Sequence, residues 1–156
     1  MLFLTHLAAA ALLARPARLS PVGLVAGAAL PDLVDKPLGA VGVFDIYHTV
    51  GHSLLLLAIV GPLALFGRQG VAILVGWLSH LLLDAIHVVL NGRPEHLTFL
   101  GWPLLQPNPL DVPPGEFIFY YLWSPSFFLE LGIWCVIGYL LVANRHTVRR
   151  ILHERT

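Results

Sequence analysis

Residues 71–90 have the sequence VAILVGWLSHLLLDAIHVVL, and this stretch decides the fold class. A helix rises about 1.5 Å per residue, so a helix of this length matches the roughly 30 Å hydrocarbon core of a bilayer. The polar residues that interrupt the stretch are Ser79, His80, Asp84 and His87. The stretch therefore predicts a membrane-embedded helix that carries ionisable side chains.

The composition of the whole chain agrees with a membrane protein. Of its 156 residues, 57% are hydrophobic and 12% are charged, and the formal net charge is zero. A soluble domain carries about 25% charged residues, so a water-soluble domain, a disordered chain, a coiled coil and a basic nucleic-acid-binding domain are all disfavoured. The single cysteine, Cys135, excludes an intramolecular disulfide.

Further apolar stretches flank this central one, at residues 2–14, 21–30, 51–66 and 117–143. The first two are short for a span and predict half-length or tilted helices packed inside a bundle. A cleavable signal peptide is the alternative for the first stretch, but the arginines follow its apolar run instead of preceding it. We expect one all-α domain over residues 1–156, a small polytopic membrane bundle with about five membrane-embedded helices.

The basic residues predict the orientation of this bundle. Seven of the nine basic side chains would share one side, namely Arg15, Arg18, Arg68, Arg145, Arg149, Arg150 and Arg155. Lys36 and Arg93 fall on the other side, so the positive-inside rule places the larger set in the cytoplasm. We therefore expect a multi-pass protein of the inner or plasma membrane, with a cytoplasmic basic tail at residues 144–156 and non-cytoplasmic loops at 31–50 and 91–116.

The ionisable residues of the predicted spans follow a helical spacing. His80 and Asp84 are four residues apart, which places both side chains on one face of a helix. His48 and His52 repeat the same spacing at the start of the next stretch. An ionisable group inside a membrane costs several kcal/mol unless it is paired, ligated or hydrated, so each is a candidate functional residue.

Histidines and aspartates from separate stretches are predicted to lie at the same, non-cytoplasmic end of the bundle. Imidazole nitrogen and carboxylate oxygen are the ligands of zinc, and also of iron and manganese. We predict one or two divalent ions, zinc above all, held by His6, Asp32, His52, His80 and Asp84. Asp35 and His48 are the candidates for a general base or for orienting a metal ligand.

Structural alternatives exist for the same residues. His80 and Asp84 could form a hydrogen-bonded pair, Asp32 could cap a helix, and His6 could contact lipid headgroups. His52 could bond a loop carbonyl. Other ionisable residues are expected to be bystanders, substrate contacts or headgroup neighbours, namely His87, His96, His146 and His153. Glu130 faces the site or pairs with a hydroxyl or histidine of an inner helix.

Five short motifs in the first two thirds of the chain resemble a known family. They are Thr5-His6, the run at 30–37 (LPDLVDKP), Gly51-His52-Ser53, His80-Leu81-Leu82-Leu83-Asp84 and Trp102-Pro103-Leu104. In this order they are similar to membrane-bound metal-dependent hydrolases described as LexA-binding inner-membrane-associated hydrolases. His80-x-x-x-Asp84 also resembles a signature of the helical zinc-dependent phospholipase C and P1-type nuclease group. The resemblance implies a helical metal hydrolase.

Three functions from different classes fit these observations. The first is a metal-dependent hydrolase that acts on an ester or phosphoester substrate, lipid-linked or soluble, at the non-cytoplasmic side. The second is an ion or proton transporter that uses the same histidines and aspartates, although the inner halves of the spans offer no polar path. The third is a non-catalytic membrane scaffold whose metal holds the helices together. We expect the lipid bilayer as the partner and no nucleic acid.

Overall fold

The computed structural model describes residues 2–44, 46, 48–106 and 117–144. In this part of the chain every regular element is helical, which confirms the all-α class. The elements in chain order are α1 (Phe3–Leu12), α2 (Ala14–Ala17), α3 (Pro21–Ala40), η1 (Leu54–Leu56), α4 (Leu57–Val60), η2 (Gly61–Phe66), α5 (Gly67–Leu90), η3 (Pro94–Gly101), α6 (Phe117–Tyr121) and α7 (Pro125–Ala143).

The helix α3 extends well beyond its predicted end at residue 30. It continues through Pro31 and Pro37 and ends only at Ala40, so the predicted boundary is wrong. Proline lacks a backbone N–H and usually ends or kinks a helix. Here the turns beyond Pro31 are stabilised from outside the helix, because Asp35 lies on them and is fully buried among hydrogen-bond donors.

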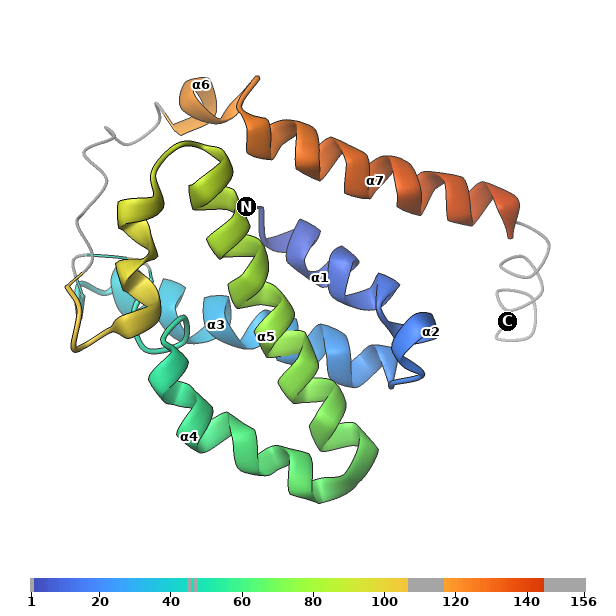
Figure 1. Cartoon of the computed structure of the whole chain (residues 1–156), viewed down its shortest axis with the longest axis horizontal. Coiled ribbons are helices and arrows are strands. Elements are labelled where there is room, and N and C mark those ends of the chain that lie inside the picture. Colours follow the sequence, from blue (N-terminus) through green and yellow to red (C-terminus); the bar gives the residue numbers. More distant parts are fainter. Residues whose placement is uncertain (1, 45, 47, 107–116, 145–156) are drawn as a thin grey trace.

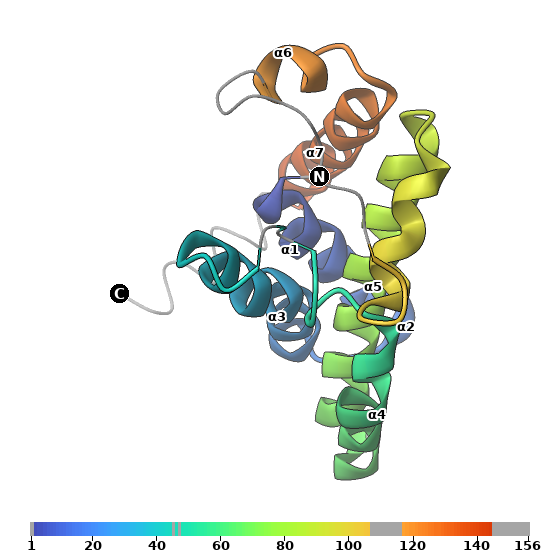
Figure 2. The same ribbon diagram turned by 90° about the vertical axis from the view of Figure 1, so that its left-hand side faces the viewer.

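The elements α4 and η2 descend toward Gly67, where the chain turns back into α5 (Figures 1 and 2). Gly67 has a φ of +76°, a backbone conformation that favours glycine. The prediction of two separate helices here is correct in outline. The first begins at Leu54 instead of residue 51, and the second begins at Gly67 instead of residue 71. His52 therefore lies in the loop that precedes η1.

The helices α3 and α5 cross at glycines, with their backbones in contact. A Cβ at Gly76 would lie 2.0 Å from the carbonyl oxygen of Leu24, and a Cβ at Gly27 would lie 2.0 Å from that of Ile73. Small residues that allow such close approach are typical of helix packing in membranes. The buried apolar core at this crossing consists of Ala10, Leu24, Ala28 and Ala72.

The single helix predicted for residues 117–143 is in fact two helices. The short helix α6 ends at Tyr121, and Trp123 follows with a φ of +68°. Ser124 then caps α7, because its hydroxyl accepts a hydrogen bond from the N–H of Phe127 at 3.2 Å. Proline at the first position of α7 suits this restart, since its missing N–H would have no helical partner there.

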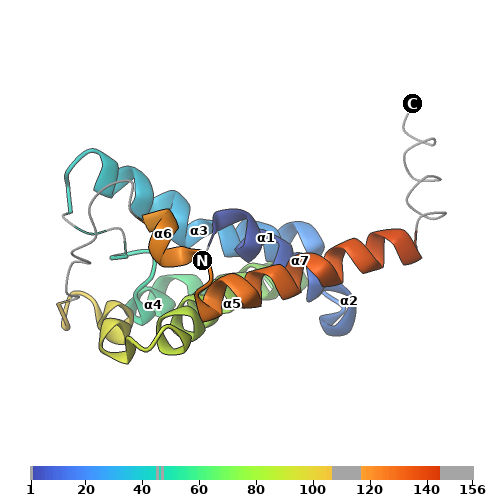
Figure 3. The ribbon, with the colours of Figure 1, turned by 90° about the horizontal axis from the view of Figure 1, so that it is seen from above.

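The start of α7 is bound to the end of α5. The amide nitrogen of Asn91 donates to the hydroxyl of Ser126 at 2.9 Å, and the N–H of Ser126 donates to the amide oxygen of Asn91 at 3.3 Å. From there α7 runs alongside α1 (Figures 1 and 3). The two longest apolar stretches therefore share one end of the molecule.

Two helical stretches of the described chain are long and apolar enough to cross a membrane. They are Leu54–Leu90, which includes the turn at Gly67, and Pro125–Ala143. Only 11% of the most apolar window of α7 is buried, and Tyr139 on this helix is 72% exposed. The helix α1 is shorter, at 10 residues. The number of about five membrane-embedded helices stays a prediction, and the basic tail at 145–156 lies outside the described residues.

Candidate metal centre

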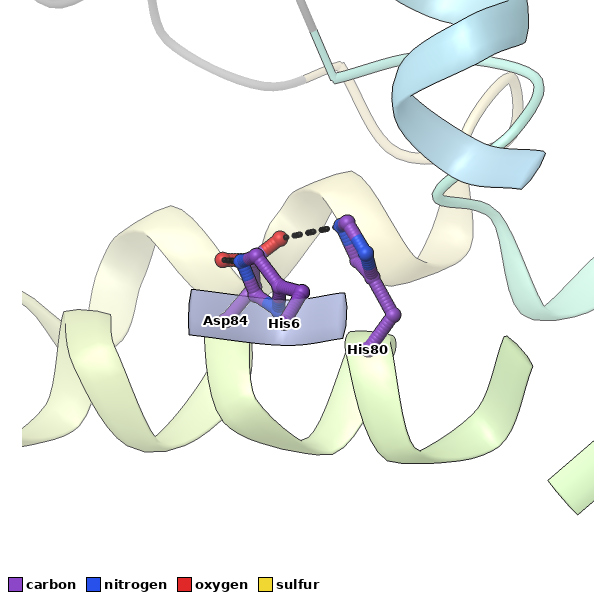
Figure 4. A group of neighbouring side chains, drawn as sticks. All are labelled: His6, His80 and Asp84. Carbon is purple, nitrogen blue, oxygen red and sulfur yellow. Dashed lines mark ion pairs between the residues drawn. The ribbon is translucent and has the colours of Figure 1, made fainter. Parts of the chain in front are cut away.

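The helix α5 carries two of the predicted metal ligands on one face. The Nε2 atom of His80 lies 3.1 Å from the Oδ2 atom of Asp84, one helical turn further along (Figure 4). His80 is fully buried and Asp84 is 5% exposed. The spacing of four residues therefore has the consequence expected from the sequence, with both side chains pointing the same way.

His6 reaches the same carboxylate from α1. Its Nε2 atom lies 3.1 Å from Oδ1 of Asp84, and its ring stacks on that of His80 with centroids 3.7 Å apart (Figure 4). Each oxygen of Asp84 is thus approached by a different histidine. Among the described residues no hydrogen-bond partner reaches the buried Nδ1 atom of His6.

His52 enters the cluster from the loop before η1. Its Nε2 atom lies 3.1 Å from Nε2 of His80, 3.5 Å from Oδ2 of Asp84 and 3.7 Å from Oδ1 of Asp32. This loop is held against α5, because the indole N–H of Trp77 donates to the carbonyl oxygen of Gly51 at 3.0 Å. His52 is fully buried.

Hydrogen bonds on the far side of the two rings determine where their protons lie. The Nδ1 atom of His80 lies 2.7 Å from the carbonyl oxygen of Ala28, and that of His52 lies 2.7 Å from Oδ2 of Asp35. A carbonyl oxygen and a carboxylate can only accept, so we assign the proton of each ring to Nδ1. The facing Nε2 atoms of His52 and His80 then each present a lone pair.

Two lone pairs that face each other at 3.1 Å repel unless a cation lies between them. The carboxylates of Asp32 and Asp84 border the same space and add negative charge to it. A proton or a metal ion therefore completes this arrangement electrostatically. A metal-ligating histidine characteristically donates its other N–H to a carboxylate or a backbone carbonyl, which both rings do here.

Asp35 is enclosed by donors on both of its oxygens. Oδ1 accepts from the hydroxyl of Thr49 and the N–H of Gly51, and Oδ2 accepts from the N–H of Thr49 and from the N–H and ring of His52. Burial acts to raise the pKa of Asp35, but the hydrogen bonds from His52, Gly51 and Thr49 outweigh it and hold the pKa below its ordinary value. Asp35 is therefore an anion that orients the ring of His52.

His48 and Lys36 form the exposed side of the cluster, its opening. Nε2 of His48 lies 3.9 Å from Oδ2 of Asp84, and Nζ of Lys36 lies 3.1 Å from Oδ1 of Asp32. Their side chains are 43% and 49% exposed, against 7% for either aspartate. Desolvation and the neighbouring His52 lower the pKa of His48, so its ring is neutral at pH 7.

The predicted ligands therefore converge, and they form three overlapping groups in which one donor atom from each residue lies within 4.8 Å of the others. The groups are His6, His80 and Asp84; Asp32, His52 and His80; and His48, His52 and Asp84. Nitrogen donors from histidine with carboxylate oxygens suit zinc, iron and manganese. Because His52, His80 and Asp84 each belong to two of the groups, the residues of the cluster could hold a metal ion.

The other ionisable residues named from the sequence lie outside these groups. The Nε2 atom of His87 accepts a hydrogen bond from the amide of Asn91 at 3.3 Å, and His96 lies 3.8 Å from its neighbour Glu95. His146 and His153 fall outside the described residues. Of the two roles expected for Glu130, the structure supports pairing with a hydroxyl.

Glu130 binds the start of α1, next to the cluster. Its carboxylate accepts a hydrogen bond from the hydroxyl of Thr5 at 2.6 Å and from the N–H of Leu2 at 3.1 Å. The indole N–H of Trp134 also donates to the hydroxyl of Thr5, at 3.2 Å. Because His6 directly follows Thr5, this contact between α7 and α1 sits beside a predicted metal ligand.

Sequence reasoning missed Lys36 and Thr49. Lys36 is four residues after Asp32 on the same helix, α3. Because the predicted helix ended at residue 30, the spacing of these two residues did not predict that their side chains would meet. Thr49 donates twice to Asp35, from its N–H and its hydroxyl. Nothing in the sequence signals that contact, since it joins α3 to a loop.

Comparisons of the chain with protein-family models, with curated proteins and with solved structures gave no match. The resemblance to membrane-bound metal-dependent hydrolases stays a prediction based on the five motifs. What the structure itself defines is the class: a helical protein with candidate membrane spans and a buried cluster of histidines and aspartates able to hold a metal ion.

Proposed function

We propose that this protein is a membrane-embedded, metal-dependent hydrolase that acts on an ester or phosphoester substrate at the non-cytoplasmic side, with zinc as its metal. The observation that carries the proposal is the pair of Nε2 atoms of His52 and His80, which lie 3.1 Å apart with their protons assigned to the opposite nitrogens. This arrangement calls for a proton or a metal ion, and the carboxylates of Asp32 and Asp84 beside it favour the divalent ion that we propose.

The surface of the helices supports a membrane location. Large apolar side chains of α7 are exposed, among them Phe128, Leu131, Trp134, Val136, Tyr139, Leu141 and Val142. A soluble protein rarely leaves such a continuous apolar surface in water. Aromatic side chains gather where α5 ends and α7 begins, including Trp123, which is 77% exposed. Tryptophan and tyrosine are enriched at the interface between membrane and water, so this end suits the level of the headgroups.

Each residue of the cluster has a place in the proposed chemistry. When bound, a divalent ion would polarise the ester or phosphoryl oxygen and make a water molecule more acidic. His6, Asp32, His52, His80 and Asp84 would hold one or two such ions. Asp35 would orient His52, which agrees with the saturation of both its oxygens. His48, on the exposed side and 3.9 Å from Asp84, would be placed to take a proton from the attacking water.

A metal-stabilised scaffold is the second candidate, and one observation favours it. The three histidines that converge most closely, His6, His52 and His80, are at most 1% exposed, as in a closed structural site. The hydrolase proposal relies on the opening at His48 and Lys36, where a substrate could approach. An activity measurement on the metal-loaded protein separates the two.

The proposal is tested on detergent-purified, full-length protein by elemental analysis and by hydrolysis of p-nitrophenyl butyrate and bis-p-nitrophenyl phosphate. We expect near-stoichiometric zinc, and loss of both zinc and hydrolysis in the double variant His80→Ala, Asp84→Ala. The matched control is His96→Ala, which removes an imidazole outside the cluster. Zinc retained in the double variant would refute the metal site, while zinc without hydrolysis of either ester would favour the scaffold.

A further inference from the structure

The opening of the metal centre carries the positive charge of Lys36, which has no role in the chemistry proposed above. Lys36 reaches over the carboxylate of Asp32 from the next turn of α3, and its side chain is 49% exposed. Its charge also acts on His48, the other residue of the opening. An ammonium group and an imidazole therefore lie on the exposed side of the buried ligands.

The charge balance of the cluster explains why the ammonium group of Lys36 can bind a further anion. The cluster contains three buried carboxylates, those of Asp32, Asp35 and Asp84, and one ammonium group, that of Lys36, lies beside Asp32. A single divalent ion brings the sum to zero, and a second makes the centre positive. The oxygens of Asp32 then bind the metal, whereas the ammonium group has three N–H donors and, among the described residues, an ion pair with Asp32 alone.

A metal-loaded cluster with an ammonium group at its opening favours an anionic group of the substrate there. The uncharged carbonyl of a carboxylic ester gains little from an ammonium group, whereas a phosphoryl group offers several anionic oxygens and forms strong charge-assisted hydrogen bonds. Lysine is a common phosphate-binding residue, acting as a compact point charge. The imidazole of His48, 43% exposed on the same side, can donate an N–H to such an oxygen.

We propose that Lys36, with His48 beside it, binds a phosphoryl group, so that the substrate is a phosphoester and not a carboxylic ester. This inference rests on the proposed function, because it needs metal at the buried ligands. The phosphoryl group belongs to a lipid headgroup or to a small soluble phosphate, and Lys36 recognises the chemistry that these share. Lys36 is thus a specificity-determining residue, while the ligands beneath it hold the ion.

The test measures zinc content and phosphate binding separately on the full-length protein in detergent. Equilibrium dialysis against radiolabelled orthophosphate is compared for the zinc-loaded wild type and for Lys36→Met, which keeps the length of the side chain but removes its charge. Lys36→Arg restores a charge, and Arg93→Met removes a charge elsewhere on the predicted non-cytoplasmic side. Dihexanoyl phosphatidic acid, offered in parallel, compares a lipid phosphate with the soluble one.

We expect Lys36→Met to keep its zinc and to bind orthophosphate at least about tenfold more weakly, the loss of one charge-assisted hydrogen bond. Lys36→Arg should recover part of the binding, and Arg93→Met should match the wild type. Tighter binding of the phosphatidic acid would identify a lipid substrate, and equal binding would identify a soluble one; either supports a phosphoryl site.

Two results would overturn the inference. Unchanged phosphate binding by zinc-loaded Lys36→Met would show that the ammonium group takes no part. Loss of zinc from the same variant would show that Lys36 acts only through Asp32. A wild-type protein that binds no zinc at all is a different failure, because it removes the proposed function itself.

Discussion

Replacement of Asp35 by asparagine tests how the buried imidazole of His52 is oriented. The carboxylate accepts five hydrogen bonds, two on Oδ1 and three on Oδ2, and the shortest are 2.7 Å. Asparagine has nearly the same shape but only one accepting atom and no charge. In its better orientation the oxygen keeps the Oδ2 position, and the new NH₂ group then faces the hydroxyl of Thr49 and the N–H of Gly51.

The magnitude follows from this count. The Thr49 hydroxyl can rotate to accept from the new NH₂ group, but the N–H of Gly51 stays buried without a partner, which costs about 1–3 kcal/mol. The remaining bonds lose the assistance of the charge, which adds roughly 1 kcal/mol. We therefore expect Asp35→Asn to lower the free energy of unfolding by about 2–4 kcal/mol, and zinc affinity to fall about 10–100-fold, as is typical when the partner of a metal-ligating histidine is removed.

The two effects are measured on separate samples. A chromophoric chelator that competes for zinc reports the affinity, and thermal unfolding of the zinc-free protein in detergent reports the stability. Glu95→Gln is the matched control, since it makes the same chemical change on a carboxylate that is 59% exposed and lies outside the cluster. Zinc affinity within twofold of the wild type would refute the view that Asp35 orients His52.

Three further predictions concern packing, the contact of α7 with α1, and pH. Gly76→Ala would push its Cβ against the carbonyl of Leu24 and separate α3 from α5. We therefore expect a loss of about 1–3 kcal/mol in thermal stability together with weaker zinc binding. The control Gly138→Ala, which has open space around it, should change neither. Glu130→Ala leaves the hydroxyl of Thr5 without its buried acceptor and should lower stability by about 1–3 kcal/mol in chemical unfolding, whereas the glutamine variant keeps an acceptor and should lose less; equal losses would contradict this reading. Protons compete with zinc for the imidazole nitrogens, so zinc affinity should rise with pH and the metal should leave below about pH 6 in dialysis, while retention at pH 5 would argue against histidine ligands.

The cluster shows which contacts can be predicted from local sequence patterns and which cannot. His80 and Asp84 share a helix, and a periodicity of 3.6 residues is enough to predict that their side chains point the same way. His6 and His52 come from other elements, and their convergence was predicted only as a shared end of the bundle. The distance of 3.1 Å between the Nε2 atoms of His52 and His80 depends on where the loop before η1 lies, and contacts to Asp35 of α3 and Trp77 of α5 hold that loop. No periodicity encodes those contacts.

The helix boundary that was predicted wrongly, at residue 30, also depends on contacts between distant parts of the chain. Proline at position 31 is a reasonable helix terminator from local propensity alone, yet the hydrogen bonds that Asp35 receives from a distant loop stabilise the turns beyond it. Because the predicted helix was cut there, the spacing of Asp32 and Lys36 went unnoticed. The break between α6 and α7, in contrast, has a local signal at Ser124, which caps the second helix.

What the sequence alone determined was therefore the apolar, all-helical character of the chain and the ionisable residue types that it keeps in apolar surroundings, because composition and helical period are local properties. The tertiary structure alone decided which nitrogen of each ring faces inward, which carboxylate orients His52, and that Lys36 stands at the opening. These features depend on hydrogen bonds between residues far apart in the chain, such as the one from His80 to the carbonyl of Ala28. Such bonds exist only once the helices have crossed.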